Sequence, residues 1–164
     1  MTATTAATAV LAGLGLLLGA GAPAGGAGRG PWATVNVCDT AGHPDGVGIR
    51  GSMPGGGPRV RLLMRFVVQF RGAGGRWRPV GAAGDSGWVD AGSAGGRGSR
   101  QAGRTFTVTP PASGGTYLLR GVVRFEWRRG KQVVRRARVR TRAGHPGTAG
   151  ADPPSFSAAT CVVR

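Results

Sequence analysis

The chain has 164 residues, which leaves room for a single domain, and its 33 glycines and 11 prolines bring it near the composition of disordered proteins. Basic residues outnumber acidic ones by 22 to 6, so the net charge is +16. Long stretches in which apolar and polar residues alternate argue against disorder, and we expect a folded core with Gly-rich loops.

Every basic residue except Lys131 is an arginine. Selection for two-pronged contacts to phosphate or carboxylate would produce this bias. A GC-rich genome would produce it too, because its codons favour Arg, Gly, Ala and Pro together, and all four are abundant in this chain. Both explanations stay open.

The first 27 residues are predicted to be an export signal. The apolar run Val10–Leu18 is too short to span a bilayer and small residues follow it, so we expect cleavage after Ala24 or Ala27. The usual basic start is missing, since the first basic residue is Arg29; a start codon placed too far downstream or a disordered tail are the alternatives. Without a nearby cysteine for a lipid anchor or a second hydrophobic span, the domain at 28–164 is expected to be secreted, free or loosely associated with the cell wall, with no transmembrane span.

Alternation with a period of two predicts β-strands along the rest of the chain. In the two longest of these segments one face is apolar and the other is mostly basic, as half-buried strands require. Pro79 restricts the strand around it to a sheet edge. The predicted strands are Trp32–Cys38, Arg59–Arg71, Arg76–Val80, Arg104–Pro110, Tyr117–Arg128 and Ala159–Val163.

Three segments rich in Gly, Ser and Pro are predicted to be loops, at 42–58, 81–103 and 142–155. They are too long for hairpin turns, so we expect them to cross between sheets or to hold short irregular strands. No window after the signal favours a long amphipathic helix. The domain is therefore predicted to be all-β, a single antiparallel two-sheet sandwich with long Gly-rich loops.

This layout of about seven strands with long crossovers resembles the immunoglobulin-like class. Together with the export signal, it is similar to small secreted actinobacterial β-sandwich proteins of unknown function. The resemblance extends from about Trp32 to Arg164 as a pattern; it implies the sandwich architecture and transfers no functional residue. Immunoglobulin domains pin two central strands with a disulfide, whereas the two cysteines of this chain lie too far apart in sequence for that arrangement.

Cys38 and Cys161 are the only cysteines, and they lie at the two ends of the predicted domain. In an exported chain an even number of cysteines indicates a disulfide. We expect this bond to join the first strand to the last, with a stabilisation of roughly 4–5 kcal/mol for so long a loop. Two buried free thiols are the alternative.

The segment 120–142 carries ten basic residues against one acid and is predicted to be a β-hairpin. A three-residue loop at 129–131 sets Trp127 opposite Val133 and keeps the inner face mostly apolar, whereas a two-residue loop would bury charge. Arg135 is the exception on the inner side. We expect it near the sheet rim with its head in water, or turned outward by a bulge.

The outer face of this hairpin is a candidate anion-binding site. The same register sets Arg124 opposite Arg136 and Arg120 opposite Arg140, and directly opposed like charges destabilise a sheet. Glu126 offsets part of this cost, and an anionic partner would offset more. The candidate anion-binding residues are Arg120, Arg124, Arg136, Arg138 and Arg140.

Two short motifs resemble those of chymotrypsin-like serine proteases, GDSG around Ser86 and TAGH ending at His43. They would make Ser86 the nucleophile, His43 the base, and Asp45 or another acid between them the orienting group. That fold needs two β-barrels, which this chain is too short to build, and Trp88 stands where the motif continues with glycine and would crowd the oxyanion region. A secreted serine hydrolase is kept as a remote alternative, and we predict no enzyme.

We also predict no metal site and no cofactor. His43 with Asp39 and Asp45 could form a His–Asp site, but solvated loop groups explain these residues as well. Paired carboxylates for glycoside hydrolysis are not indicated, because the only glutamate, Glu126, lies among cations that should lower its pKa. The glycine-rich string at 51–58 lacks the Lys–Ser/Thr ending of a phosphate-binding loop.

The tryptophans and the basic face set the functional expectation. Trp127 is expected in the core, whereas the exposure of Trp77 and Trp88 stays open. The outward faces of the two longest strands carry no aromatic residue, so sequence-specific nucleic-acid binding is not expected. The sequence favours a secreted non-catalytic module with a structural or interaction role; the alternative is an electrostatic binder of anionic polymers, such as cell-wall polyanions, lipid head groups or extracellular nucleic acid.

Overall fold

The computed structural model describes residues 30–110 and 114–164, so the predicted export signal lies outside the described residues. No helix in the described ranges has the length and apolar character needed to cross a bilayer. Two short 3₁₀ turns occur at Ala73–Gly75 and Ala82–Gly84. The strands of the described residues are β1 (Trp32–Thr40), β2 (His43–Pro54), β3 (Gly57–Arg71), β4 (Trp77–Pro79), β5 (Asp85–Ala94), β6 (Ser99–Thr107), β7 (Tyr117–Arg129), β8 (Gln132–Arg140) and β9 (Cys161–Val163).

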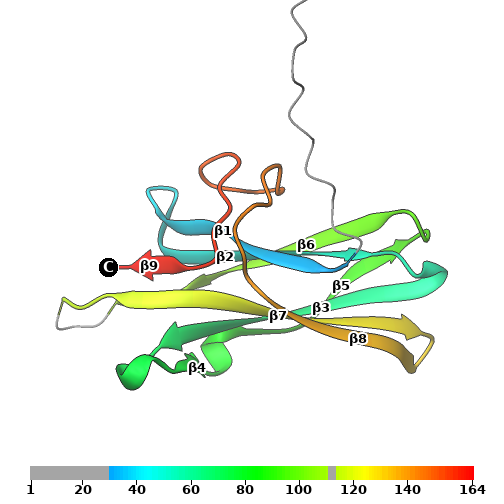
Figure 1. The fold of residues 1–164 in the computed structure, drawn as a ribbon, viewed down its shortest axis with the longest axis horizontal. Helices are drawn as coiled ribbons and strands as arrows, with labels where there is room; N and C mark the ends of the chain where they lie inside the picture. The colour runs from blue at the N-terminus through cyan, green and yellow to red at the C-terminus, as the bar shows by residue number, and fades with distance from the viewer. Residues whose placement is uncertain (1–29, 111–113) are drawn as a thin grey trace, which may run out of the picture.

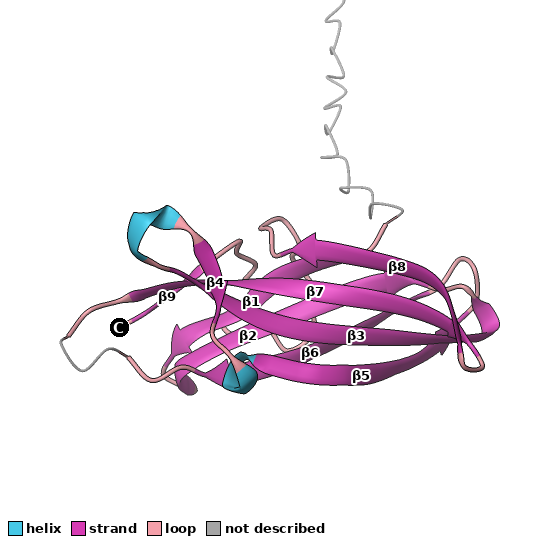
Figure 2. Cartoon of the chain, turned by 90° about the horizontal axis from the view of Figure 1, so that it is seen from below, coloured by secondary structure: helices cyan, strands magenta, loops and turns pink. Residues whose placement is uncertain are grey.

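These strands form two antiparallel sheets packed face to face, which confirms the predicted all-β sandwich (Figure 1, Figure 2). Sheet A has the order β1-β2-β6. In sheet B the long strands β3 and β7 are central. β4 and β5 pair with the other side of β3, while β8 and β9 pair with the other side of β7. The immunoglobulin-like classification stays a prediction.

The core lies between the two sheets and follows the predicted alternation. Sheet A contributes apolar side chains such as Val35, Val47 and Ile49, all fully buried. Burying a side chain of this size contributes about 1.5–3 kcal/mol, so the two inner faces together hold the sheets in contact. The buried inward residues of β3 and β7 are Val60, Leu62, Met64, Phe66, Val68, Leu119, Val123, Phe125 and Trp127.

The prediction of loops at 42–58 and 81–103 is wrong, because these segments form most of β2, β5 and β6. β2 runs through the middle of sheet A although it contains several glycines. A Cβ on Gly48 would lie 2.7 Å from the Cβ of Val37, and one on Gly51 would lie 3.2 Å from the sulfur of Met64. Gly51 therefore marks close packing between the two sheets, and Gly48 marks close packing between the neighbouring strands β1 and β2.

The third predicted loop, 142–155, lies between β8 and β9 and contains none of the strands given above. It runs along the free edge of β1. Just after it, Val35 and Ala158 exchange backbone hydrogen bonds of 2.9 and 3.0 Å. The Asn36 side chain donates a hydrogen bond of 2.7 Å to the carbonyl of Gly150. The loop and the residues after it thereby cover a sheet edge that would otherwise expose unpaired backbone groups.

A disulfide joins Cys38 of β1 to Cys161 of β9, with their Cα atoms 5.3 Å apart. The bond links sheet A to sheet B and connects two residues 123 positions apart in the sequence. The predicted bond between the first and last strands is therefore confirmed.

Candidate anion-binding site

The β7–β8 hairpin carries most of the candidate residues, and its register differs from the predicted one. Its turn has two residues, Gly130 and Lys131, since Arg129 pairs with Gln132. A bulge in β8 then shifts the register, so that Trp127 faces Arg135 rather than Val133. The bulge supplies the extra residue that the predicted three-residue loop would have supplied, so residues 135–140 still point to their expected faces. Val133, before the bulge, faces Arg128 on the outer side instead of Trp127 on the inner side.

The outer face of the hairpin therefore has different cross-strand pairs from those predicted. Arg124 faces Arg138 rather than Arg136, which faces Glu126 instead. Arg140 faces Val122, not Arg120. Within the β7–β8 hairpin one directly opposed pair of like charges remains, Arg124 with Arg138, instead of the two predicted.

Four arginines of sheet B have carboxylate partners. Glu126 is buried and accepts hydrogen bonds from Arg128 (Nε, 2.8 Å) and Arg136 (Nε, 3.1 Å). Burial opposes the ionised form of Glu126, but the hydrogen bonds and positive charges of these two arginines together outweigh it and hold the pKa of Glu126 below the ordinary value, as its cationic surroundings predicted. The remaining ion pairs are Arg65–Asp85 and Arg61–Asp90. Arg136 is thus engaged within the fold.

A second group of arginines surrounds a hollow of about 660 Å³ at the end of β8. We call this hollow, lined by Trp77, Arg120, Arg138, Arg140 and Arg142, the arginine groove. Its remaining lining residues are Val139, Thr141, Ala159 and Thr160. Among the described residues, none of its four arginines forms an ion pair with a carboxylate.

Arg120 is the most enclosed of these arginines. Its guanidinium carbon lies 4.2 Å from the centre of the Trp77 ring, and its Nε donates a 2.9 Å hydrogen bond to the Gln69 side chain. Burial lowers the pKa of Arg120, and the positive charges of Arg140 and Arg138 lower it further. The groove is therefore a site of uncompensated positive charge that a bound anion would neutralise.

A second hollow of about 380 Å³ lies on the same face, beside the groove. We call it the Trp88 hollow; its lining side chains include Trp88, Arg124, Arg136 and Arg138. Because Arg138 also lines the arginine groove, the two hollows adjoin. Trp88 is 38 % exposed, and the guanidinium of Arg128 lies 5.8 Å from its ring centre.

Sequence reasoning missed the two tryptophans of this face. Trp77 pairs with Arg71, and Trp88 pairs with Arg65, so both indoles share the outer face with the arginines of β3. The outward faces of β3 and β7 themselves carry no aromatic residue, as the sequence indicates. The neighbouring strands β4 and β5 supply the aromatic rings, and only the pairing of those strands with β3 reveals this.

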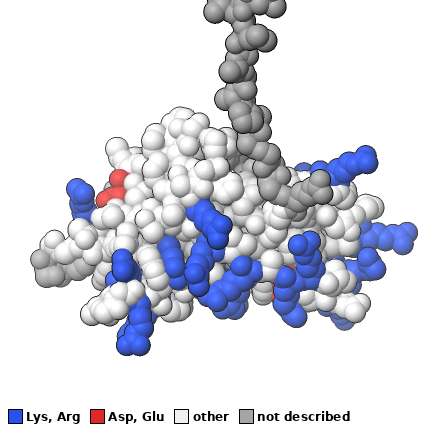
Figure 3. All heavy atoms as spheres, in the orientation of Figure 1, with Lys and Arg blue, Asp and Glu red and all other residues white. Residues whose placement is uncertain are grey.

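The basic side chains are unevenly distributed over the molecule. In Figure 3, Lys and Arg gather across the lower half of the view, where Figure 1 places β3, β4, β7 and β8, and at the right-hand end, where Figure 1 places the β5–β6 connection. The upper middle of the view is nearly free of them. Of the five predicted anion-binding residues, the structure brings Arg120, Arg138 and Arg140 together in the groove, whereas Arg124 and Arg136 line the Trp88 hollow.

The protease-like residues do not form a catalytic arrangement. The Ser86 hydroxyl accepts a hydrogen bond from the Phe66 amide (2.9 Å) and donates one to the carbonyl of Gly87 (2.7 Å). His43 begins β2 in the other sheet, and no hydrogen bond joins a serine to His43 among the described residues. The Asp39 carboxylate accepts from the Asp45 amide (2.9 Å), and no cluster of three or more metal-binding side chains occurs in the described ranges.

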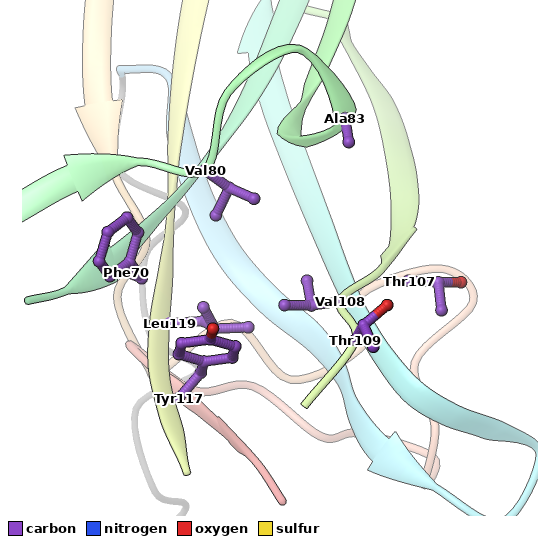
Figure 4. Close-up of a pocket in the computed structure, with 8 residues that line it drawn as sticks. All are labelled: Phe70, Val80, Ala83, Thr107, Val108, Thr109, Tyr117 and Leu119. Atoms are coloured by element: carbon purple, nitrogen blue, oxygen red, sulfur yellow. The ribbon is translucent and has the colours of Figure 1, made fainter. Parts of the chain in front are cut away.

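An apolar cleft of about 310 Å³ opens at the end of the sandwich, where β3, β6 and β7 converge (Figure 4). Phe70 and Tyr117 meet edge-on in its wall, with ring centres 6.2 Å apart. The cleft carries no charged side chain, so it is separate from the anion-binding candidates. Its lining residues are Phe70, Val80, Ala83, Thr107, Val108, Thr109, Tyr117 and Leu119.

Comparison of the sequence with protein-family models finds no match. Comparisons with curated proteins and with solved structures find none either. The function is therefore inferred from the geometry of the outer face of sheet B.

Proposed function

We propose that this protein is a non-catalytic β-sandwich module that acts outside the cell and binds anionic polymers with the outer face of sheet B. One observation carries the proposal. Arg120, Arg138, Arg140 and Arg142 surround a single hollow and form no ion pair with any described carboxylate. Elsewhere on the same face, Arg61, Arg65, Arg128 and Arg136 have carboxylate partners. The groove therefore gathers four arginines whose charge an external anion could neutralise.

The chemistry of the groove suits phosphate or carboxylate groups on a polymer. Guanidinium groups bind such anions in a two-pronged geometry, and each charge they neutralise releases a counterion from the polymer. Several arginines on neighbouring positions match several charges in a row better than they match one small anion. The large positive net charge would also attract polyanions over a longer range.

An extracellular location is supported by two features. The apolar run at the start of the sequence has the character of an export signal. The disulfide between Cys38 and Cys161 is typical of oxidising compartments. Outside the cell, the available anionic partners are cell-wall polyanions, lipid head groups and extracellular nucleic acid.

A purely structural module is the second candidate, and the position of β8 favours it. β8 pairs only with β7, and charged residues on an edge strand prevent other strands from adding to the sheet. In that case the arginines would protect the fold and bind nothing.

Salt-dependent binding separates the two candidates. The affinity for heparin and for DNA is measured from low to physiological salt, for the wild type and for Arg138→Gln/Arg140→Gln. A matched control is Arg97→Gln/Arg104→Gln, which changes the charge equally at two exposed arginines that line neither hollow. We expect the groove variant to reduce the slope of log affinity against log salt concentration by about 2, one for each lost phosphate contact. The control should leave this slope unchanged.

Two results would contradict polyanion binding by the groove. One is equal weakening by both double variants, which would mean that only the net charge matters. The other is binding by the wild type that disappears at physiological salt, which would leave the structural module as the better account.

A further inference from the structure

The two outward tryptophans distinguish between the polyanions that this face could bind. Arg120 stacks on Trp77, and Arg128 approaches the ring of Trp88. Unpaired bases stack both on aromatic rings and on arginine planes. Each hollow therefore combines a flat surface for a ring with nearby positive charge, whereas a purely electrostatic site would need only the charge.

The two hollows form a continuous track because Arg138 lines both of them. Along β8, Arg138 and Arg140 point to the same face, and alternate residues of a strand lie roughly 6.8 Å apart. A flexible chain can therefore place successive phosphates on successive arginines while its rings reach the indoles on either side.

Glu126 divides the roles of the two hollows. Its buried carboxylate lies in the lining of the Trp88 hollow, next to Arg136. A negative charge there disfavours a phosphate and is shared between Arg128 and Arg136. Of the other arginines in this hollow, Arg124 and Arg138, neither has a carboxylate partner among the described residues. The arginine groove contains no carboxylate, so phosphates fit the groove and a base fits against Trp88.

We propose that the polymer bound by this face is a single-stranded nucleic acid, held without sequence preference by the arginine groove and the Trp88 hollow. This inference rests on the proposed function and names its ligand class. A duplex hides the faces of its bases from the indoles, and inorganic polyphosphate has no ring to place on them. Positive grooves with aromatic stacking platforms are the general means by which proteins hold single strands.

The first experiment compares ligands of equal charge. Fluorescein-labelled oligothymidine is titrated with the full-length protein at roughly 0.15 M salt, with anisotropy as the readout. Unlabelled duplex DNA, linear polyphosphate and poly(glycerol phosphate) serve as competitors. We expect oligothymidine to bind most tightly and to quench tryptophan fluorescence, because the bases stack on indoles.

The second experiment tests the tryptophans through Trp77→Leu and Trp88→Leu. Each substitution should weaken binding of oligothymidine by roughly 5- to 150-fold, the loss typical of one base stack. Trp88→Leu, which lies outside the arginine groove, should leave polyphosphate binding unchanged. Trp88→Phe should retain most of the affinity because it keeps an aromatic ring. Trp32→Leu is the matched control, since Trp32 stacks on His145 away from both hollows; circular dichroism confirms that each variant is folded.

The outcomes separate the inference from the function on which it rests. If the Trp77 and Trp88 variants bind oligothymidine as tightly as the Trp32 control, or if a ring-free polymer binds as tightly as oligothymidine, the single-strand inference is wrong while polyanion binding stands. If none of the polymers binds at this salt concentration, the proposed function is wrong as well.

Discussion

The guanidinium of Arg135 lies 4.5 Å from the centre of the Trp127 indole, directly across the β7–β8 pair. Trp127 is buried and donates its indole N–H to the carbonyl of Pro54 at 2.8 Å. Arg135 is exposed, although its side chain is on the inward side of the sheet. It therefore covers the rim of the core with its stem and keeps its charge in water.

Removing this cation–π contact should destabilise the fold slightly. We expect Arg135→Gln to lower the free energy of unfolding by about 0.5–1 kcal/mol. Arg135→Lys keeps a cation over the ring and should lower it by less. Urea denaturation followed by tryptophan fluorescence measures the change. Arg97→Gln, at an exposed site in the β5–β6 connection, should have almost no effect. Equal losses in the two glutamine variants would show that the contact contributes nothing.

Loss of the Cys38–Cys161 disulfide should lower the free energy of unfolding substantially. For Cys38→Ala/Cys161→Ala we expect a loss of roughly 4–5 kcal/mol, because the bond restricts a 123-residue separation in the unfolded chain. Urea unfolding with and without reductant measures it. Reductant should destabilise the wild type and leave the double variant unchanged. A wild type that is insensitive to complete reduction would contradict this.

Gly121 is a position on β7 where the packing leaves no room for a side chain. A Cβ there would lie 2.7 Å from Thr141 Cγ2 and 2.8 Å from two carbons of Ile49. We expect Gly121→Ala to cost about 1–3 kcal/mol through overpacking. Gly95→Ala is the control, since nothing lies within 4 Å of its Cβ position. A melting temperature that falls equally in both variants would exclude a steric cause.

The two central strands could be predicted because alternation along a strand is a local signal in the sequence. The disulfide could be predicted because two cysteines allow only one pairing. Even-numbered apolar residues on β3 and odd-numbered ones on β7 reveal an inner face directly. With only Cys38 and Cys161 present, one connectivity is possible. The glycines led to the wrong prediction of loops at 42–58 and 81–103. A glycine that allows close packing in a strand, as Gly48 does against Val37, cannot be distinguished in sequence from a glycine in a loop.

The anion-binding face could be predicted only in part, because it depends on contacts between distant segments. The bulge in β8 has no signature in the sequence, so the Arg–Arg pairs were misassigned although their face was right. Trp88 reaches that face because β5 pairs with β3, and this pairing depends on the whole fold. The engagement of Arg136 by Glu126 follows from the same long-range register.

His145 should make stability depend on pH near neutrality. Its ring stacks on Trp32 with centres 4.2 Å apart, and burial lowers its pKa below the ordinary 6.5. As the pH falls through 6.5, the unfolded chain takes up a proton that the folded chain resists, so the free energy of unfolding decreases. His145→Phe keeps a ring but cannot titrate, and it should lose this dependence between pH 7.5 and 5.5. Urea midpoints across that window measure it; identical slopes for variant and wild type would contradict it.

Glu126 should make stability depend on pH in a more acidic range than His145 does. Its substitution should also affect stability and polyanion binding in opposite directions. Its pKa lies below the ordinary 4.5 because the hydrogen bonds and positive charges of Arg128 and Arg136 together outweigh its burial. The stability it contributes is therefore complete above pH 4.5 and is lost as the pH falls through its folded pKa. Glu126→Gln should cost about 1–2 kcal/mol at pH 7, and the difference from the wild type should shrink as the pH falls through the folded pKa of Glu126. A stability difference that stays constant as the pH is lowered until the wild type unfolds would show that the carboxylate contributes through its shape and not its charge.

The same variant frees Arg136 beside the Trp88 hollow, so it should bind polyanions more tightly while being less stable.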